Sequence, residues 1–552
     1  MRHANSGAAR PAAGDMPLSR EGTLAGTWTL IRFILRRDRV RIPVWTVAVG
    51  GSIVGTALSY ADTFPTQTDL DSRAELAGTP VFVAFNGPGF GLDNYTLGAM
   101  VAHETLYLAI ILVALMSVFL TVRHTRAEEE SGRAELVRSA VTGRHAMLAS
   151  SLVVVSALNV VVGLLTAAGL SGIDRLDGRG SLTFGISMIA AGLVFTAVAA
   201  VVLQVTEYSR GAVGIGVAVL GASYAVRAVG DVSETGLSWL SPFAWSLHTR
   251  AYVDERWWPL LLSLTLAVVL TAAAIMLNAR RDVVAGLMPA RPGRPHASPR
   301  LTRLGGLPFR QQRAGMLAWT AGLALLGAAF GPLLSDIEEF VAENERVQEI
   351  VAAAQGATII ESFLGTITGM LALLATGFAV SSALRMRNEE AVGRLEPLLA
   401  TGLPRHRWMA GYLIVMLGGS MIVMLAGSLT LGVTASIDQR DPALVFNLLA
   451  AGVVHMPAIW VVAMLAVALF GVLPRLAPAA WLVLGYGVIV SLLGPAIGLE
   501  ESQLRNLSPF DHVPELPGAE FSIMPVVILS AIAVGLALAG LAGFRRRDLH
   551  AA

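Results

Sequence analysis

The sequence predicts an all-α polytopic membrane protein with twelve transmembrane helices, arranged as two tandem six-helix units. Three observations support this fold class. The 552 residues are 54% hydrophobic and 14% charged, with a mean hydropathy of +0.64, which is too apolar for a soluble enzyme of this length. Twelve apolar segments are long enough to cross a bilayer. Sequence landmarks of the first half recur in the same order in the second half.

Each predicted span rests on length and hydropathy. A bilayer core about 30 Å thick requires roughly 20 apolar residues in a helix, because lipid offers no partner to an unpaired backbone group. The candidate spans lie near residues 42–62, 101–122, 146–170, 182–206, 211–229 and 257–278, and near 315–335, 358–384, 408–434, 443–472, 476–498 and 523–543. A cytoplasmic N-terminus puts most arginine residues inside, which predicts a plasma-membrane protein with both termini cytoplasmic.

The two halves share several landmarks. "LRRDRVRIPVWT" before the first span resembles "PFRQQRAGMLAWT" before the seventh, and pairs Trp45 with Trp319. "LSPF" and "RRD" each occur once near the end of either half. We therefore expect a tail at 1–22, a first unit at 23–284, a cytoplasmic linker at 285–306 and a second unit at 307–552.

The most detailed repeat is the charged stretch "RAEEESGRAELVRSAVTGRH", which begins at Arg126. A shift of 261 residues places Glu128, Glu129, Arg133, Glu135, Arg144 and His145 on identical residues of a second copy near residue 390, which lacks the third consecutive glutamate of the first. In each copy a glutamate precedes an arginine by four residues, as in Glu390 and Arg394, which favours a helical ion pair. Each copy is therefore predicted to form a short amphipathic helix, although Pro397 and Pro404 are expected to break the second one.

Two interpretations of these loops remain open from the residues alone. A basic amphipathic segment can rest on lipid headgroups and fix the topology of the chain. It can also dock on a partner protein. Carboxylates gain nothing from anionic lipid, and both copies keep the same order of charges, so the pattern favours docking.

The charged loop followed by a span, in a chain of duplicated six-helix units, resembles the permease of a type 2 ABC exporter. More narrowly, it resembles the actinobacterial polyketide-antibiotic exporters of the tetronasin type, from about residue 25 to 548. The resemblance implies that the loops couple the chain to a separate ATPase subunit in two copies, which would bind ATP and Mg. The coupling residues it implies are Glu128, Glu129, Glu130, Arg133, Glu135, Arg138, Arg144, Glu389, Glu390, Arg394, Glu396 and Arg405.

The composition excludes several kinds of site in this chain. There is no lysine, so the phosphate-binding loop of a P-loop ATPase is absent, and there is no cysteine to serve as nucleophile or thiolate ligand. We therefore expect a transport subunit without an ATPase site, cofactor or metal of its own. Its partners would be the ATPase, the bilayer and a small hydrophobic substrate, without nucleic acid.

A few polar residues lie within or at the ends of the apolar spans. Asn159 and His455 are expected to form interhelical hydrogen bonds, although either could line a substrate path. Glu104 and Glu361 begin the second span of each half; solvation at the outer rim is the simpler interpretation of both, and a place on the substrate path is the alternative. Arg227 ends a span, where we expect its side chain to extend outward to water.

The function that these observations favour is export of hydrophobic or amphipathic compounds, such as antibiotics, drugs or lipids, driven by ATP hydrolysis in a separate subunit. The alternative is a proton-driven secondary multidrug carrier, which also commonly has twelve spans in two halves. That alternative predicts carboxylates deep in the spans, where the sequence has almost none. A membrane enzyme is also conceivable, but no catalytic constellation repeats between the halves.

Overall fold

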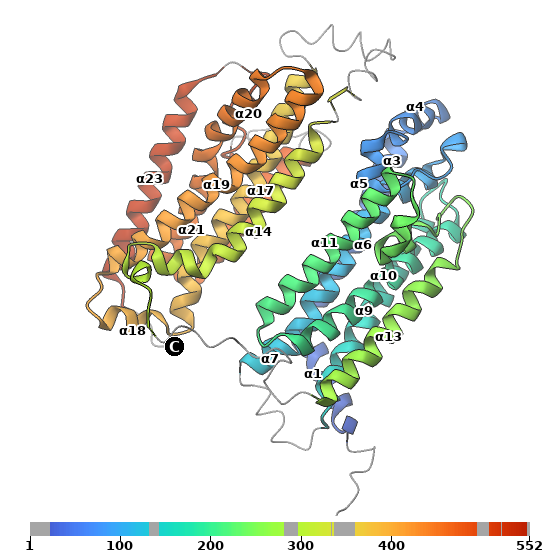
Figure 1. Cartoon of the computed structure of the whole chain (residues 1–552), viewed down its shortest axis with the longest axis horizontal. Coiled ribbons are helices and arrows are strands. Elements are labelled where there is room, and N and C mark those ends of the chain that lie inside the picture. Colours follow the sequence, from blue (N-terminus) through green and yellow to red (C-terminus); the bar gives the residue numbers. More distant parts are fainter. Residues whose placement is uncertain are drawn as a thin grey trace, which may run out of the picture. The chain divides into compact units, whose positions relative to one another are not determined.

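The computed structural model describes residues 23–131, 143–280, 296–332, 334–335, 359–493, 507–519 and 521–548. The chain forms two compact units, Met1–Pro292 and Gly293–Ala552, which are drawn together in Figure 1. Throughout the described residues the regular structure is helical.

Twelve of the described helices are long and apolar enough to cross a membrane, which confirms the predicted fold class. The chain is therefore a multi-pass membrane protein. In the first unit these spans are Arg41–Thr63 (α2, η2 and α3), α6 (Leu97–His124), α9 (Ala146–Ser171), α10 (Gly178–Val205), α11 (Ser209–Val232) and α13 (Pro259–Arg280). In the second they are α14 (Gly306–Phe330), α17 (Ile359–Ala391), α19 (Arg405–Gln439), α20 (Ala443–Val454) with α21 (Met456–Val472), Pro474–Ser491 (η6 and α22) and α23 (Ile523–Arg546).

Short helices lie at both ends of the spans. At one end of each unit, here called the loop end, they include α1 (Thr27–Arg37), α7 (Arg126–Glu130) and α18 (Leu395–Ala400). At the opposite end of the first unit lie α4 (Gln67–Ala77), α5 (Pro80–Asn86), η3 (Leu92–Asn94), η4 (Gly236–Leu240) and α12 (Pro242–Leu247). The short helix η5 (Pro299–Thr302) precedes α14, and α22 spans Ala480–Leu493.

The second and fourth spans form the centre of each unit. In the first unit α10 packs against α6, α9 and α13, and in the second unit α21 packs against α17 and α23 (Figure 1). These central spans are also the most buried ones, whereas the first and sixth spans of each unit leave most of their surface to lipid. Glycines bring central helices close together, since a Cβ added at Gly471 of α21 would overlap the Gly540 carbonyl of α23. Each half is therefore a bundle built around its second and fourth spans.

The fourth span of the second unit differs from that of the first. Its helix is interrupted at His455, between α20 and α21, where Pro457 follows in the first turn of α21. The first unit has the continuous helix α10 at the equivalent place. Proline provides no backbone N–H and disfavours the helical conformation of the preceding residue, which explains the interruption.

Candidate functional site

The glutamates of the first charged loop contact neighbouring helices at the loop end. Glu128 accepts a hydrogen bond from Arg37 of α1 at 2.6 Å. Glu130, the last residue of α7, accepts from the Ser209 backbone N–H at 2.5 Å and from the Ser209 hydroxyl at 2.6 Å. The loop is thus connected both to the helix that precedes the first span and to the start of the fifth span.

Arg126 joins the same loop to the end of the fourth span. Its guanidinium is buried, with 1% of the side chain exposed, and its Nε donates to the Thr206 carbonyl at 2.9 Å. Thr206 caps the C-terminus of α10, where helix carbonyls lack partners and carry partial negative charge. Glu129 lies 2.5 Å from the Arg126 guanidinium and balances its charge.

The second charged loop repeats this geometry. Arg387 stands 261 residues after Arg126, and its Nε donates at 2.9 Å to the carbonyl of Pro474, just beyond the end of α21. Glu389, the equivalent of Glu128, accepts from Gln311 of α14 at 3.4 Å. Gln311 follows Arg37 by 274 residues, the offset that relates Trp45 to Trp319. The equivalent contacts support the internal duplication that the sequence landmarks predict.

Glu390 joins the second loop to the last helix, α23. Two nitrogens of Arg547, which caps α23, donate to its carboxylate at 2.7 Å and 2.5 Å. The guanidinium of Arg547 also lies over the rings of Phe470 and Phe544, at 5.0 Å and 5.3 Å. The expected pair of Glu390 with Arg394 is therefore wrong. Arg394 instead lies 3.5 Å from Glu389, which is 2% exposed.

A residue just after each charged loop forms hydrogen bonds with the end of the sixth span, namely Arg405 in the second unit and His145 in the first. Arg405 donates to the carbonyl of Phe544 at 3.0 Å and to that of Arg547 at 2.7 Å. In the first unit the Asn278 amide donates to Nδ1 of His145 at 2.8 Å. Partial burial, and then the neighbouring charge of Arg144, lower the pKa of His145, which favours the neutral ring that this hydrogen bond needs.

The predicted amphipathic helix of the second loop is shorter than the sequence suggests. Glu389 and Glu390 belong to the end of α17, and only Leu395–Ala400 form α18. The chain turns at Gly393 and Gly402, whose φ angles are +72° and +82° and thus suited to glycine. In the first loop Arg133, Glu135 and Arg138 lie outside the described residues, and of the helix predicted there only the start is described, within α7 (Arg126–Glu130).

The two prolines do not break α18, contrary to expectation. Pro397 is the third residue of α18, where a backbone N–H has no intrahelical acceptor in any case. Pro404 is the N-cap of α19 and stands outside both helices. Both positions tolerate proline, so the shape of the loop follows from its glycines.

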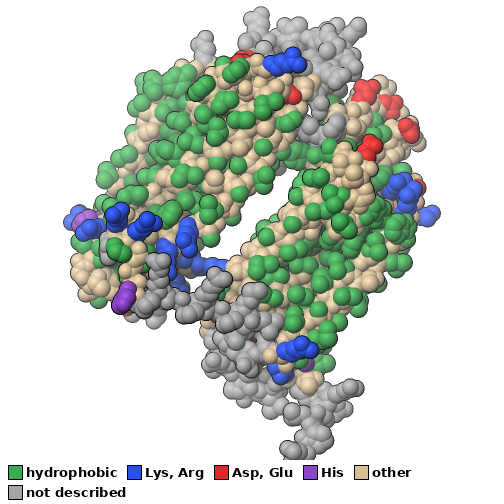
Figure 2. Space-filling model, viewed as in Figure 1, with side chains coloured by type: hydrophobic (Ala, Val, Ile, Leu, Met, Phe, Trp, Pro, Cys, Tyr) green, Lys and Arg blue, Asp and Glu red, His purple; other side chains and the backbone are tan. Residues whose placement is uncertain are grey.

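The second loop presents an exposed surface. Arg394 and Val392 are 57% and 55% exposed, and Glu396 is exposed as well. Basic side chains and a histidine gather at this end of the unit in Figure 2, and the exposed ones include Arg407, His406, Arg545 and Arg546. The carboxylates at 389 and 390 face inward, so a partner would meet α18 and this basic surface.

The polar residues of the spans have local partners. Asn159 of α9 donates to Ser117 of α6 at 2.9 Å and to Thr196 of α10 at 3.3 Å, which confirms the predicted interhelical hydrogen bonds. His455 donates through Nδ1 to the carbonyl of Ala451 at 2.8 Å, within its own span rather than to another one. The arrangement is that of bundle core residues.

Glu104 contradicts the expectation of outer-rim solvation. Its side chain is 5% exposed, and Arg73 of α4 donates to both carboxylate oxygens, at 2.7 Å and 2.8 Å. The hydroxyl of Tyr60 donates to it at 3.0 Å. Glu361 lies in the first turn of α17 and is half-buried. Glu104 therefore secures α4 over the opposite end of the first unit.

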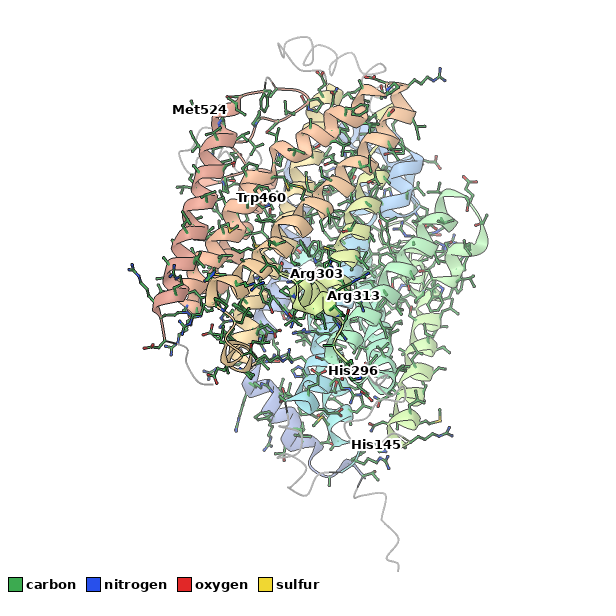
Figure 3. All side chains as sticks on the ribbon, turned by 60° about the vertical axis from the view of Figure 1, so that its left-hand side comes forward. His145, His296, Arg303, Arg313, Trp460 and Met524 are labelled. Atoms are coloured by element: carbon green, nitrogen blue, oxygen red, sulfur yellow. The ribbon has the colours of Figure 1, made fainter. Side chains whose placement is uncertain are left out.

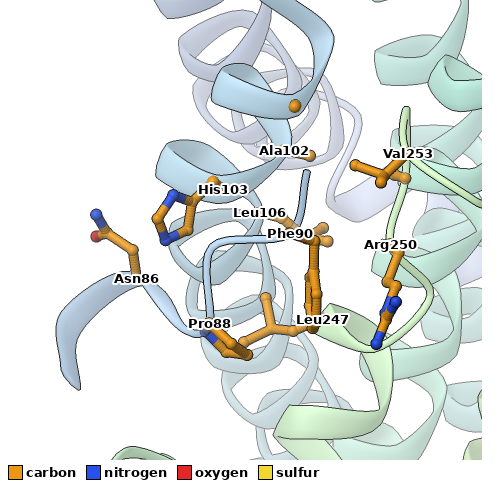
Figure 4. Close-up of a pocket in the computed structure, with 11 residues that line it drawn as sticks. Asn86, Pro88, Phe90, Ala102, His103, Leu106, Leu247, Arg250 and Val253 are labelled. Carbon is orange, nitrogen blue, oxygen red and sulfur yellow. The ribbon is translucent and has the colours of Figure 1, made fainter. Parts of the chain in front are cut away.

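Arg227 likewise contradicts the prediction that it extends to water. It is fully buried and donates to the carbonyls of Val83 and Phe85, at 3.1 Å and 2.9 Å, with Asp231 at 3.7 Å. These carbonyls belong to α5, so Arg227 fixes that short helix against α11. A small pocket lies nearby, lined on one side by His103 and on the other by Phe90 and Arg250, whose guanidinium lies 4.4 Å from the ring centre (Figure 4).

Two apolar grooves run between the fourth and sixth spans, one in each unit. The first lies between α10 and α13 and is lined by residues such as Ile189, Leu193 and Trp258. The second lies between α21 and α23, with Val461 along its side and Met524 at the end far from the loop end (Figure 3). Neither groove is lined by Asn159, His455, Glu104 or Glu361. Their surfaces suit hydrophobic molecules.

Comparison with known proteins identifies the family. The family model described as "Multidrug efflux system permease Rv1217c, C-terminal domain" matches residues 31–277 and 301–545, two stretches of nearly equal length. The multidrug efflux system permease protein Rv1217c of Mycobacterium tuberculosis (strain ATCC 25618 / H37Rv) is 38% identical over 550 residues, covering 98% of each chain. The chain belongs to this family of multidrug efflux permeases. A permease of this family is a transport protein, while the narrower resemblance to tetronasin-type exporters stays a prediction.

Sequence reasoning missed several residues of the loop end. Arg126 and Arg387 occupy equivalent positions in the two copies, and this register was a signal that could have marked them as a functional pair. Arg547 stands in the repeated "RRD" motif, but nothing in that motif indicates that it binds Glu390. In this efflux permease the first charged loop thus contacts α1, the end of α10 and the start of α11, and the second contacts α14, the turn after α21 and the end of α23.

Proposed function

We propose that this efflux permease is the membrane subunit of an ATP-driven ABC exporter that moves hydrophobic or amphipathic compounds out of the cell. A separate ATPase subunit, in two copies, would dock on the charged loops at the cytoplasmic face and bind ATP and Mg. The observation that carries this proposal is the repeated attachment of each loop to the turn that follows a fourth span, through Arg126 and Arg387. A force applied to either loop is thereby transmitted into the bundle.

The exposed part of the second loop supplies the docking surface. The exposed side chains of Glu396 and Arg394, in and just before α18, carry opposite charges, and the exposed Val392 adds apolar area. Polar rims with a small apolar centre are typical of protein interfaces. The apolar grooves of both units, in turn, favour the binding of a hydrophobic substrate that partitions into the bilayer. The two termini would be cytoplasmic, on the same face as the loops.

Charge reversal at Glu396 tests the docking surface. We expect Glu396→Arg to reduce the amount of ATPase subunit that copurifies with the chain by about tenfold, equivalent to roughly 1.4 kcal/mol, while the permease itself remains folded because Glu396 is exposed. The matched control is Glu75→Arg, the same reversal at an exposed position of α4 at the opposite end. Equal recovery of the ATPase with both variants would contradict docking on α18.

A further inference from the structure

Glu130 supplies a missing helix cap to the fifth span of the first unit. The first backbone N–H groups of a helix have no intrahelical acceptor, and a nearby negative charge stabilises that end. The residue at the N-cap of α11 is Tyr208, which forms no side-chain capping bond. Glu130 accepts from the Ser209 N–H and hydroxyl instead, at 2.5 Å and 2.6 Å. The cap of α11 thus comes from the charged loop.

The same short helix holds both sides of the turn between the fourth and fifth spans. At one end of α7, the positive Arg126 binds the Thr206 carbonyl at the C-terminus of α10. At its other end, the negative Glu130 binds the N-terminus of α11. Each charge is opposite to the partial charge of the helix end that it meets. A displacement of α7 therefore acts on α10 and α11 together.

The second unit has only one of these two contacts. Arg387 binds the carbonyl of Pro474, the first residue of η6 and two residues past the end of α21, much as Arg126 binds the carbonyl just past α10. The position 261 residues after Glu130 is Ala391, whose methyl group cannot accept a hydrogen bond. The fifth span of that unit, α22, begins at Ala480 after the proline-containing helix η6. No carboxylate at the equivalent position joins the second loop to its fifth span.

We infer that the two halves are coupled unequally to their docking loops, and that Glu130 is a positioning residue that adds the fifth span of the first half to the coupled movement. This inference rests on the proposed function, in which an ATPase moves the loops. Glu130 touches neither substrate nor ATP; it acts by joining α7 to α11. The second loop reaches the start of η6 through Arg387, but the residue at the position of Glu130, Ala391, has no side-chain acceptor to cap its fifth span.

The test is transport per ATP hydrolysed, measured in proteoliposomes that contain the permease and its ATPase subunit. We expect Glu130→Ala to lower this ratio about fivefold, the factor that corresponds to a lost helix cap. The variant should fold, because Glu130 is exposed and its removal leaves no buried charge unpaired. Glu130→Gln keeps an acceptor oxygen and should retain most of the ratio. Glu207→Ala, a charge removal in the turn beside α11, should leave the ratio unchanged.

A spectroscopic readout separates positioning from general stability. The chain has no cysteine, so Ser131→Cys and Arg210→Cys provide the only sites for a pair of spin labels on the loop and on α11. We expect the distance distribution between the labels to broaden with Glu130→Ala and to be unchanged with Glu207→Ala. Ser209→Ala should add little to Glu130→Ala, since both remove the same contact.

The possible failures are distinguishable. If the unaltered chain binds no ATPase and transports without ATP hydrolysis, the proposed function is wrong. If the unaltered complex couples transport to ATP hydrolysis but Glu130→Ala leaves both the ratio and the label distances unchanged, the proposed function stands and unequal coupling through Glu130 is wrong.

Discussion

Glu390→Arg is expected to abolish transport while the chain still inserts into the membrane. The substitution removes the two short hydrogen bonds from Arg547 and places a second positive charge against a guanidinium that is only 13% exposed. Breaking a fully buried ion pair typically costs about 3–5 kcal/mol, which is an upper bound for this partly buried one. The end of α23 would then separate from the second loop, and the docking surface would lose its shape. Transport of a fluorescent hydrophobic substrate, normalised to membrane protein, measures the effect.

The reciprocal exchange provides the control for this prediction. Glu390→Arg combined with Arg547→Glu restores opposite charges at the same place and should recover part of the transport. Glu75→Arg, at an exposed position, should be harmless. If Glu390→Arg alone transports normally, the contact with Arg547 does not hold the loop in the working protein.

Arg227→Ala is expected to destabilise the opposite end of the first unit by about 3–5 kcal/mol. The substitution removes the two guanidinium hydrogen bonds to the carbonyls of Val83 and Phe85, and it leaves the nearby Asp231 carboxylate without its balancing charge. The rings of Tyr224 and Phe243 also lose a cation that lies 4.4 Å and 5.5 Å from their centres. We expect α5 to detach from α11.

Cysteine accessibility measures this detachment directly. A single cysteine introduced at Thr79, at the N-cap of α5, should react with a membrane-impermeant thiol reagent much faster in the Arg227→Ala background. Arg210→Ala removes the same side chain from an exposed position of the same helix and serves as the control. Equal labelling in both backgrounds would show that Arg227 is dispensable for α5.

The twelve spans were predictable because bilayer thickness fixes the length of an apolar helix, and α10 and α13 fulfil that requirement without help from tertiary contacts. The equivalence of the two charged loops was also predictable, since a shift of 261 residues relates Arg126 to Arg387. The contact partners of Glu390 and Arg227 were not predictable from the sequence. Local spacing suggested Arg394 for the first and water for the second, whereas both partners come from distant elements.

The charges of the loop also have a different role from the predicted one. Spacing along a helix indicates which side chains share a face, but it does not indicate that Glu389 and Glu390 turn inward while Glu396 remains outside. The break at Gly393 decides this, because its positive φ ends α17 and redirects the chain into α18. The inward carboxylates shape the loop, and the exposed residues remain to bind a partner.

The most direct test of the account is the energy source of transport. Proteoliposomes are prepared with this permease alone or together with its copurified ATPase subunit, and uptake of a fluorescent hydrophobic compound is followed after adding ATP and Mg or imposing a proton gradient. The account predicts transport only with both proteins and ATP. Transport by the permease alone, driven by the proton gradient and indifferent to ATP, would contradict it and identify a secondary carrier.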